Sequence, residues 1–177
     1  MLEALITSKT RIKLLLKFFL NSQNTGYLRS LEPEFGESTN AIRQELNRFE
    51  NAGLLLSSID GQKKIFQANT SHPLFPELHS LLLKYVGIDK IIDRVINNLG
   101  KLEEVYLVGE LAKGNDSPNI DLWFIGDHID ESYLKGLTQK VEEFIQRKVK
   151  YLILGSDELN KQIAMKDSNE LLLVWKA

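Results

Sequence analysis

One amphipathic helix, followed at once by a hairpin turn, constrains the fold more than any other feature of the chain. Ser38 is a residue type that caps helix N-termini and Gly53 a type that ends helices, so the sequence predicts a helix from Ser38 to Ala52. At 100° per residue, one face of this helix is apolar and the opposite face is polar. The apolar residues are Ile42, Leu46 and Phe49, and the polar ones are Asn40, Arg43, Gln44, Asn47 and Asn51.

The hairpin is predicted from a glycine turn between two strand-like runs. Asp60-Gly61 separates residues 54–59 from residues 64–68, and Asp-Gly in this position is a strong signal for a tight hairpin. Lys63 and Lys64 flank the tip. The sequence therefore predicts a basic hairpin directly after the polar-faced helix.

Two further helices are expected before the polar-faced one. Residues 9–20 carry an apolar stripe at helical spacing, with Lys9, Lys13 and Lys17 on the opposite face. Residues 27–35 predict a short helix that ends at Gly36, and Pro33 is expected to shorten or bend it.

The order of helix, short helix, polar-faced helix and basic hairpin is that of a winged helix-turn-helix. In this layout the second helix of the pair enters the major groove and the hairpin lies near the phosphate backbone. A solvated helix face and a lysine-bearing hairpin without a ligand are the alternative interpretation. The residues predicted to contact DNA are Ser38, Thr39, Asn40, Arg43, Gln44, Asn47, Arg48, Lys63 and Lys64.

Two segments of this half resemble the ArsR-type winged-helix regulators. One comprises Gly26-Tyr27-Leu28-Arg29, Phe35-Gly36-Glu37-Ser38 and the run from Arg43 to Leu54, and the other is residues 69–78. The resemblance spans about residues 8–80 and implies binding of double-stranded DNA as a homodimer. The chain has neither a cysteine pair nor a histidine-rich set, so the resemblance does not imply a metal sensor.

The second half alternates strand-like and helix-like segments, which predicts a small α/β sandwich. Helical periodicity over residues 74–99 leads into it, and Gly87 is a candidate break between two helices. Strands are expected at 105–108, 120–125, 149–154 and 171–175, and a helix at 131–146. The expected division is a domain over residues 1–86 and another over 87–177, in an α+β or α/β chain.

The segment from Tyr106 to Leu122 resembles the minimal nucleotidyltransferases of the polymerase-beta superfamily. That signature is Gly-Ser at a turn, Asp-x-Asp on the next strand and a further acid on a later strand, because carboxylates must hold two Mg²⁺ ions. In this chain the serine and two of the acids of that signature are replaced by other residues. We therefore expect a vestigial site without catalytic residues, metal ions or cofactors. The residues at the signature positions are Gly109, Glu110, Asn119, Asp121 and Lys150.

Charge and composition favour an intracellular DNA-binding protein. Residues 1–86 carry 10 Lys and Arg against 8 Asp and Glu, whereas residues 87–177 carry 12 against 16, so the first half suits a polyanion better. The absence of cysteine excludes disulfides and thiolate metal sites, and no 18-residue apolar run suggests a membrane partner, so a cytoplasmic location is expected.

The sequence thus favours a transcriptional regulator that is not an enzyme. Its second domain would sense a small molecule, contact a protein partner or dimerise. Two alternatives are an active nucleotidyltransferase with a nucleic-acid-binding module and an antitoxin-like protein-interaction module.

Overall fold

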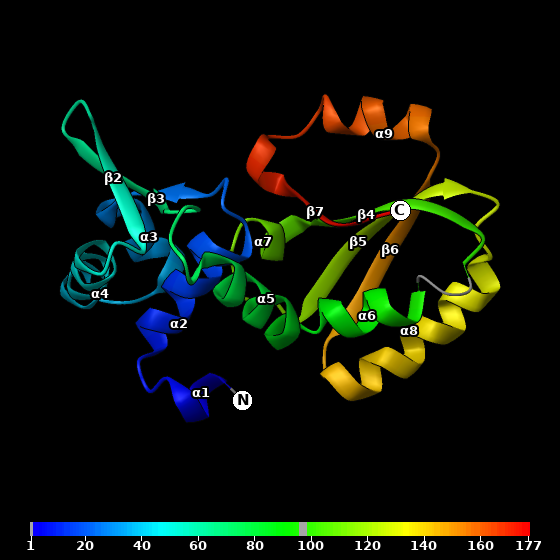
Figure 1. The fold of residues 1–177 in the computed structure, drawn as a ribbon, viewed down its shortest axis with the longest axis horizontal. Helices are drawn as coiled ribbons and strands as arrows, with labels where there is room; N and C mark the ends of the chain where they lie inside the picture. Colours follow the sequence, from blue (N-terminus) through cyan, green and yellow to red (C-terminus); the bar gives the residue numbers. More distant parts are fainter. Residues whose placement is uncertain (1, 96–98) are drawn as a thin grey trace. The chain divides into compact units, whose positions relative to one another are not determined.

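The computed structural model describes residues 2–95 and 99–177. The chain forms two compact units, each with its own set of helices and its own sheet (Figure 1). Unit 1 comprises Met1–Tyr85 and Gly114–Asp116, and unit 2 comprises Val86–Lys113 and Ser117–Ala177. The architecture is mixed α and β, as the sequence predicted. In the described residues, no helix has the length and apolar character needed to cross a membrane.

Helices make up most of unit 1, and local signals explain where several of them start and stop. The side chain of Ser8 accepts a hydrogen bond from the backbone N–H of Arg11 and so caps α2. The α3 helix ends at Gly36, which has the left-handed backbone conformation (φ 62°) that glycine adopts without strain. The helices are α1 (Leu2–Leu5), α2 (Lys9–Leu15), the π-helix η1 (Leu16–Leu20), α3 (Leu28–Phe35), α4 (Thr39–Asn51) and α5 (Phe75–Val86).

Two local expectations in unit 1 were wrong. The predicted single helix over 9–20 becomes a π-helix in its second half, and Lys17, expected on the outer face, is 8% exposed and pairs with Glu34 at 2.7 Å. Every residue of η1 is buried, so an outer face no longer exists there. The expected shortening by Pro33 does not occur: Pro33 lies inside α3, which continues to Phe35 because Leu31 and Phe35 anchor the helix in the core.

A three-stranded antiparallel sheet completes unit 1. Its order is β1-β3-β2, and β2 and β3 form the predicted hairpin, with Gly61 at a φ of 58° in the turn. Leu55, Phe66 and Ala68 are buried, whereas the residues near the tip are exposed. The strands are β1 (Thr25–Gly26), β2 (Leu55–Asp60) and β3 (Lys63–Ala68).

Unit 2 is built on a four-stranded sheet in the order β6-β5-β4-β7. The β4 strand is antiparallel to both β5 and β7, whereas β6 is parallel to β5 and is reached through the helix α8. Helices α6 and α8 cover one face and α9 lies over the other (Figure 1). The strands are β4 (Lys101–Val108), β5 (Asn119–Asp127), β6 (Lys148–Leu154) and β7 (Leu171–Lys176).

The helices of unit 2 include three that the sequence did not predict. Gly87 has a φ of 97° and separates α5 from α6, as expected, and α8 matches its prediction. The short α7, the helix α9 and the 3-10 helix η2 were not predicted. The helices are α6 (Ile88–Val95), α7 (Gly109–Ala112), α8 (Glu131–Ile145), α9 (Ser156–Ile163) and the 3-10 helix η2 (Ser168–Glu170).

Candidate functional site

The polar face of α4 is exposed, because its apolar face fills the core of unit 1. Ile42, Leu46 and Phe49 are buried at 0%, 1% and 6% exposure. Ser38 caps the helix by accepting a hydrogen bond from the N–H of Ala41. The helix therefore has a fixed start and a fixed rotation, and both orient its exposed polar side chains. These are Asn40, Arg43, Gln44, Asn47 and Arg48.

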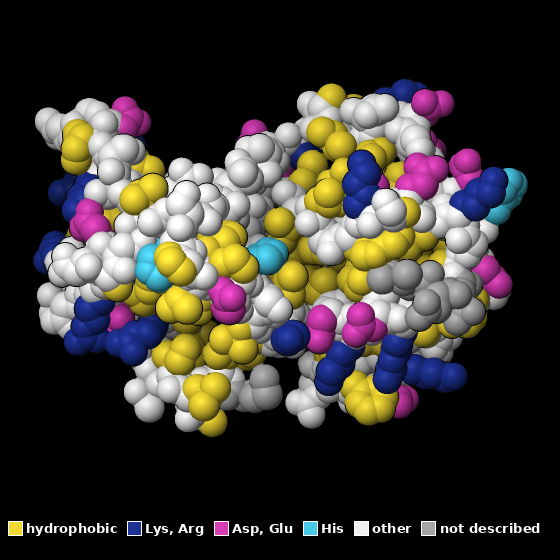
Figure 2. All heavy atoms as spheres, in the orientation of Figure 1, with side chains coloured by type: hydrophobic (Ala, Val, Ile, Leu, Met, Phe, Trp, Pro, Cys, Tyr) yellow, Lys and Arg dark blue, Asp and Glu magenta, His cyan; other side chains and the backbone are white. Residues whose placement is uncertain are grey.

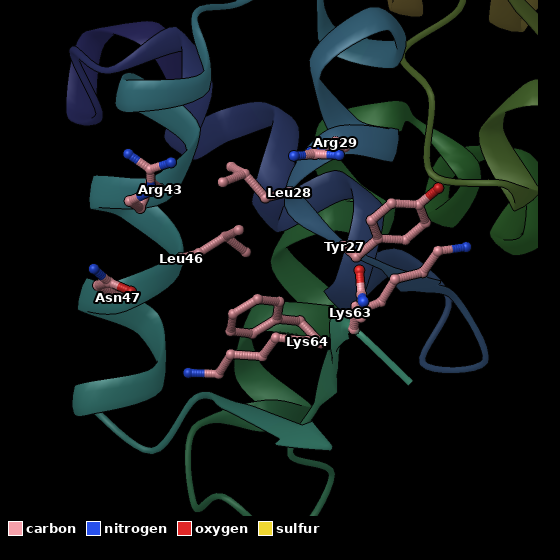
Figure 3. A pocket seen from close by; sticks show the side chains of 10 residues that line it. Tyr27, Leu28, Arg29, Arg43, Leu46, Asn47, Lys63 and Lys64 are labelled. Carbon is pink, nitrogen blue, oxygen red and sulfur yellow. The ribbon is translucent and has the colours of Figure 1, made fainter. Parts of the chain in front are cut away.

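A hollow of about 640 Å³ lies between α3, α4 and the hairpin of unit 1 (Figure 3). Its polar lining comes from all three elements: Arg29 from α3, Arg43 and Asn47 from α4, and Lys63 and Lys64 from β3. Tyr27, Leu28, Leu46 and Phe66 supply its apolar lining. In the space-filling view, Lys and Arg side chains lie along the outer edge of unit 1, with Asp and Glu side chains among them (Figure 2). We call this feature the basic hollow.

Aromatic rings hold both lysines of the hairpin. The Nζ atom of Lys63 lies 4.7 Å from the ring centroid of Tyr27, and that of Lys64 lies 5.2 Å from the ring centroid of Phe66. At these distances the cations are attracted to the ring faces. These contacts restrain the side chains of both lysines, which are among the residues that line the hollow.

A carboxylate of α4 also contacts the hairpin. Glu50 accepts a hydrogen bond from Lys64 at 2.7 Å and another from Ser57 at 2.5 Å. These two bonds lower the pKa of the Glu50 carboxyl below its ordinary value. Glu50 therefore stays ionised at neutral pH and offsets part of the charge of Lys64.

A buried carboxylate ties α4 to α2. Glu45 accepts hydrogen bonds from Arg11 at 2.9 and 3.1 Å, from Ser8 at 3.2 Å and from Arg48 at 3.0 Å. Burial raises the pKa of the Glu45 carboxyl, but the hydrogen bonds and charges of these partners lower it by more than burial raises it. The net shift of the pKa is therefore downward. Arg48 is consequently committed to an intramolecular ion pair.

The structure brings together four of the nine residues predicted to bind DNA. Arg43, Asn47, Lys63 and Lys64 line the basic hollow. Ser38 serves as a helix cap, and Thr39 donates a hydrogen bond to Glu32 at 3.4 Å. Asn40, Gln44 and Arg48 are exposed on α4 outside the hollow. The sequence did not predict that Tyr27 and Arg29, at the start of the short helix, line this hollow, because periodicity does not show which elements pack beside the hairpin.

In unit 2, a second hollow of about 310 Å³ lies at the end of β4. Strand register builds it: Val108 pairs with Asp121 across the antiparallel β4–β5 ladder, and Asp121 pairs with Lys150 across the parallel β5–β6 ladder. Gly109 follows at a φ of 73°, and a Cβ placed there would lie 3.0 Å from Oδ2 of Asp121. We call this feature the Asp121 hollow.

Three of the five signature positions meet at the Asp121 hollow. Gly109, Asp121 and Lys150 line it, whereas Glu110 and Asn119 do not. Glu110 is exposed in α7, and Asn119 begins β5 with its N–H bonded to Ser117. Trp123, Tyr151 and Lys166 also line the hollow. The alternation of side chains along a strand could have predicted that Trp123 lies on the same face as Asp121. Lys166 could not have been predicted in this way, because it follows a helix that the sequence did not predict.

The donor set does not fit a pair of divalent cations. Asp121 is the single carboxylate among the described residues that line the hollow, and Lys150 and Lys166 line it as well. Within residues 2–95 and 99–177, no three His, Cys, Asp or Glu side chains are grouped as metal ligands. Two-metal catalysis needs a clamp of several carboxylates, so we derive no metal-dependent step for these residues.

No family model and no curated protein matches this chain. Solved structures that match include two mutant forms of the toxin–antitoxin MntA–HpeT. One is 24% identical, covers 51% of this chain and 72% of its own, and has a TM-score of 0.41. The other is 22% identical, covers 50% and 73%, and has a TM-score of 0.40. A candidate nucleotidyltransferase from Sulfolobus solfataricus is 26% identical, covers 56% and 86%, and has a TM-score of 0.37.

These matches correct one expectation. The prediction that the chain is a pseudo-nucleotidyltransferase and no enzyme is contradicted, because a candidate nucleotidyltransferase is among the similar structures, and we withdraw it. The matches do not identify catalytic residues in this chain. The resemblance of the first half to ArsR-type regulators stays a prediction.

Proposed function

We propose that this chain binds duplex DNA through unit 1 and handles a nucleotide or related phosphate compound through unit 2. The basic hollow is the observation that carries the first part. Arg43 and Asn47 project from one helix, and two lysines project from the adjacent hairpin. Arginine and asparagine can each form paired hydrogen bonds with base edges, whereas lysines neutralise phosphates.

More specifically, the proposal is that the chain regulates transcription. In the winged helix-turn-helix layout, α4 would lie in the major groove with the β2–β3 hairpin along the backbone. Two copies would read two half-sites, so a homodimer belongs to the proposal. Exposure of the polar face of α4 and the fixed cap at Ser38 support it.

The test is a titration of the full chain with selected and scrambled duplexes at several salt concentrations. The double variant Arg43→Ala/Lys63→Ala should lose selective binding, because it removes one residue from each side of the hollow. The double variant Lys9→Ala/Lys84→Ala removes the same charge from exposed positions outside the hollow and should bind as the parent does. Equal binding by all three proteins would reject the proposal and favour a protein-interaction module.

Nucleotidyl transfer is the second candidate function; it would have to proceed without a two-metal clamp, because Asp121 is the single carboxylate among the described residues that line the hollow. A glycine turn next to a strand carboxylate is the part of the transferase signature that this chain retains. The test is transfer of label from nucleoside triphosphates to candidate protein or nucleic-acid acceptors. Asp121→Asn should abolish transfer, whereas Asp127→Asn, at the exposed end of the same strand, should not. No transfer to any acceptor would remove this candidate.

A further inference from the structure

The Asp121 hollow lies on the face of the unit 2 sheet that faces α9. Strand alternation places Asp121 and Trp123 of β5 on this face, opposite Lys150 and Leu152 of β6 in the parallel register. All four residues line the hollow. Laterally paired residues on one face have neighbouring Cβ atoms, so the Lys150 side chain starts next to that of Asp121.

A second lysine reaches the same hollow from the segment after α9. The Nζ atom of Lys166 lies 5.5 Å from the ring centroid of Trp123 and 3.7 Å from a carboxylate oxygen of Glu170. Glu170 is itself bound more closely to Lys113, at 2.8 Å. The single negative charge of Glu170 thus interacts with two lysines. It therefore offsets only part of the positive electrostatic potential around Lys166.

The balance of charge among the lining residues favours an anion over a cation. Two lysines and one carboxylate line the Asp121 hollow. Unlike charges a few ångströms apart attract each other and like charges repel, and both effects are stronger at a partly screened site than in bulk water. Lys150 occupies the later-strand position at which the transferase signature has an acid, and it pairs with Asp121 in the β5–β6 register.

The size of the hollow limits the part of a ligand that it can enclose. Its volume of about 310 Å³ is at the lower end of the range for small-molecule sites. A short phosphate chain suits this space and its two positive charges. The remainder of a nucleotide would extend outside it.

We infer that the Asp121 hollow binds the polyphosphate of a nucleotide, or inorganic pyrophosphate, directly as an anion, with Lys150 and Lys166 in the place of divalent cations. This inference rests on the part of the proposed function that assigns a phosphate compound to unit 2, and it does not depend on DNA binding by unit 1. It also requires no transfer reaction, because its readout is binding.

Isothermal titration calorimetry of the full chain tests this inference, with pyrophosphate, ATP and adenosine as separate probes. In EDTA, pyrophosphate and ATP should bind and adenosine should not. Lys150→Met and Lys166→Met should each weaken binding at least tenfold, and Lys150→Arg should restore most of it. Lys161→Met, at an exposed position of α9 outside the hollow, is the matched control and should bind as the parent does.

Asp121→Asn distinguishes best between a site for a bare anion and a site for a metal-bridged ligand, because the two predict opposite changes in the affinity for pyrophosphate. Removing the carboxylate should tighten pyrophosphate binding severalfold if the ligand is a bare anion, whereas a metal-bridged ligand would be lost. Binding that requires Mg²⁺, binding of ATP without pyrophosphate, no binding of either compound, or lysine variants that bind like the parent would each overturn the inference. Failure here would leave the duplex titrations of unit 1 unaffected.

Discussion

Glu50 of α4 accepts a hydrogen bond of 2.7 Å from Nζ of Lys64 in β3, so the polar-faced helix and the hairpin are joined by an ion pair at the basic hollow. This pair places a negative charge beside the surface proposed to meet DNA. It also means that Lys63 and Lys64, although adjacent in the sequence, are not equivalent cations. The first two predictions follow from this difference.

Glu50→Gln should strengthen DNA binding. The substitution removes a negative charge and releases the ammonium group of Lys64 for a phosphate. The slope of log affinity against log salt concentration should steepen by about one, the contribution of one neutralised phosphate. Duplex titrations at several salt concentrations measure the slope. Glu77→Gln, an exposed position of α5 outside the hollow, is the control and should leave it unchanged.

Arg43→Ala and Lys63→Ala should weaken DNA binding in different ways. If Arg43 reads a base edge, its loss should reduce affinity by about 1–3 kcal/mol and relax selectivity at one position. Loss of Lys63 should weaken all sequences alike and reduce the salt slope by about one. Lys64→Ala should have a smaller effect than Lys63→Ala, because Glu50 already offsets its charge. Selection from randomised duplexes separates these outcomes; identical selectivity profiles for all variants would contradict base reading by Arg43.

The buried carboxylate of Glu45 should make unit 1 sensitive to acid. Because its pKa in the folded chain lies below that of the unfolded chain, about 4.3, the ion pairs stabilise the fold fully above that pH. The stabilisation should be lost as the pH falls from about 4.3 through the lowered folded value. Glu45→Gln should lower the free energy of unfolding at neutral pH by about 1.5–3 kcal/mol. It should also reduce the acid limb, that is, the fall of this free energy as the pH decreases below about 4.3. Urea denaturation across this pH range measures both effects, and an acid limb unchanged in the variant would contradict the assignment.

Gly109→Ala should destabilise unit 2 by about 1–2 kcal/mol. The residue has a φ of 73°, which an L side chain adopts only with strain, and its new Cβ would lie 3.0 Å from the Asp121 carboxylate. Gly136→Ala, the matched control, lies in α8 with open space around the added methyl group and should stabilise the helix by about 0.5–1 kcal/mol. Thermal unfolding of the two variants should therefore shift in opposite directions.

The sequence predicts local structure well where a single element carries its own signals. Ser38, the apolar spacing and Gly53 define α4, and Asp60-Gly61 defines the hairpin, so Arg43, Asn47, Lys63 and Lys64 could be placed at one surface. The π-helix could not be predicted, because its geometry depends on packing that buries every residue from Leu16 to Leu20.

The parts of the sites that the sequence does not show depend on contacts between distant residues. Lys166 reaches Trp123 across 43 positions, and only the strand order β6-β5-β4-β7 brings Lys150 beside Asp121. Periodicity describes one strand at a time and contains no information on its neighbours. The Lys64–Glu50 pair could not be predicted for a related reason, since helical periodicity and turn signals do not show which side chains of a helix and a hairpin meet.

The pairing of β7 with β4 has a consequence for biosynthesis. A ribosome finishes β4 at Val108 more than sixty residues before it reaches β7 at Leu171, and throughout that interval one edge of β4 has no neighbouring strand. An open strand edge is a template for pairing with other chains. A nascent chain interrupted before Leu171 would therefore be prone to aggregate, and quality control of translation would have to clear it.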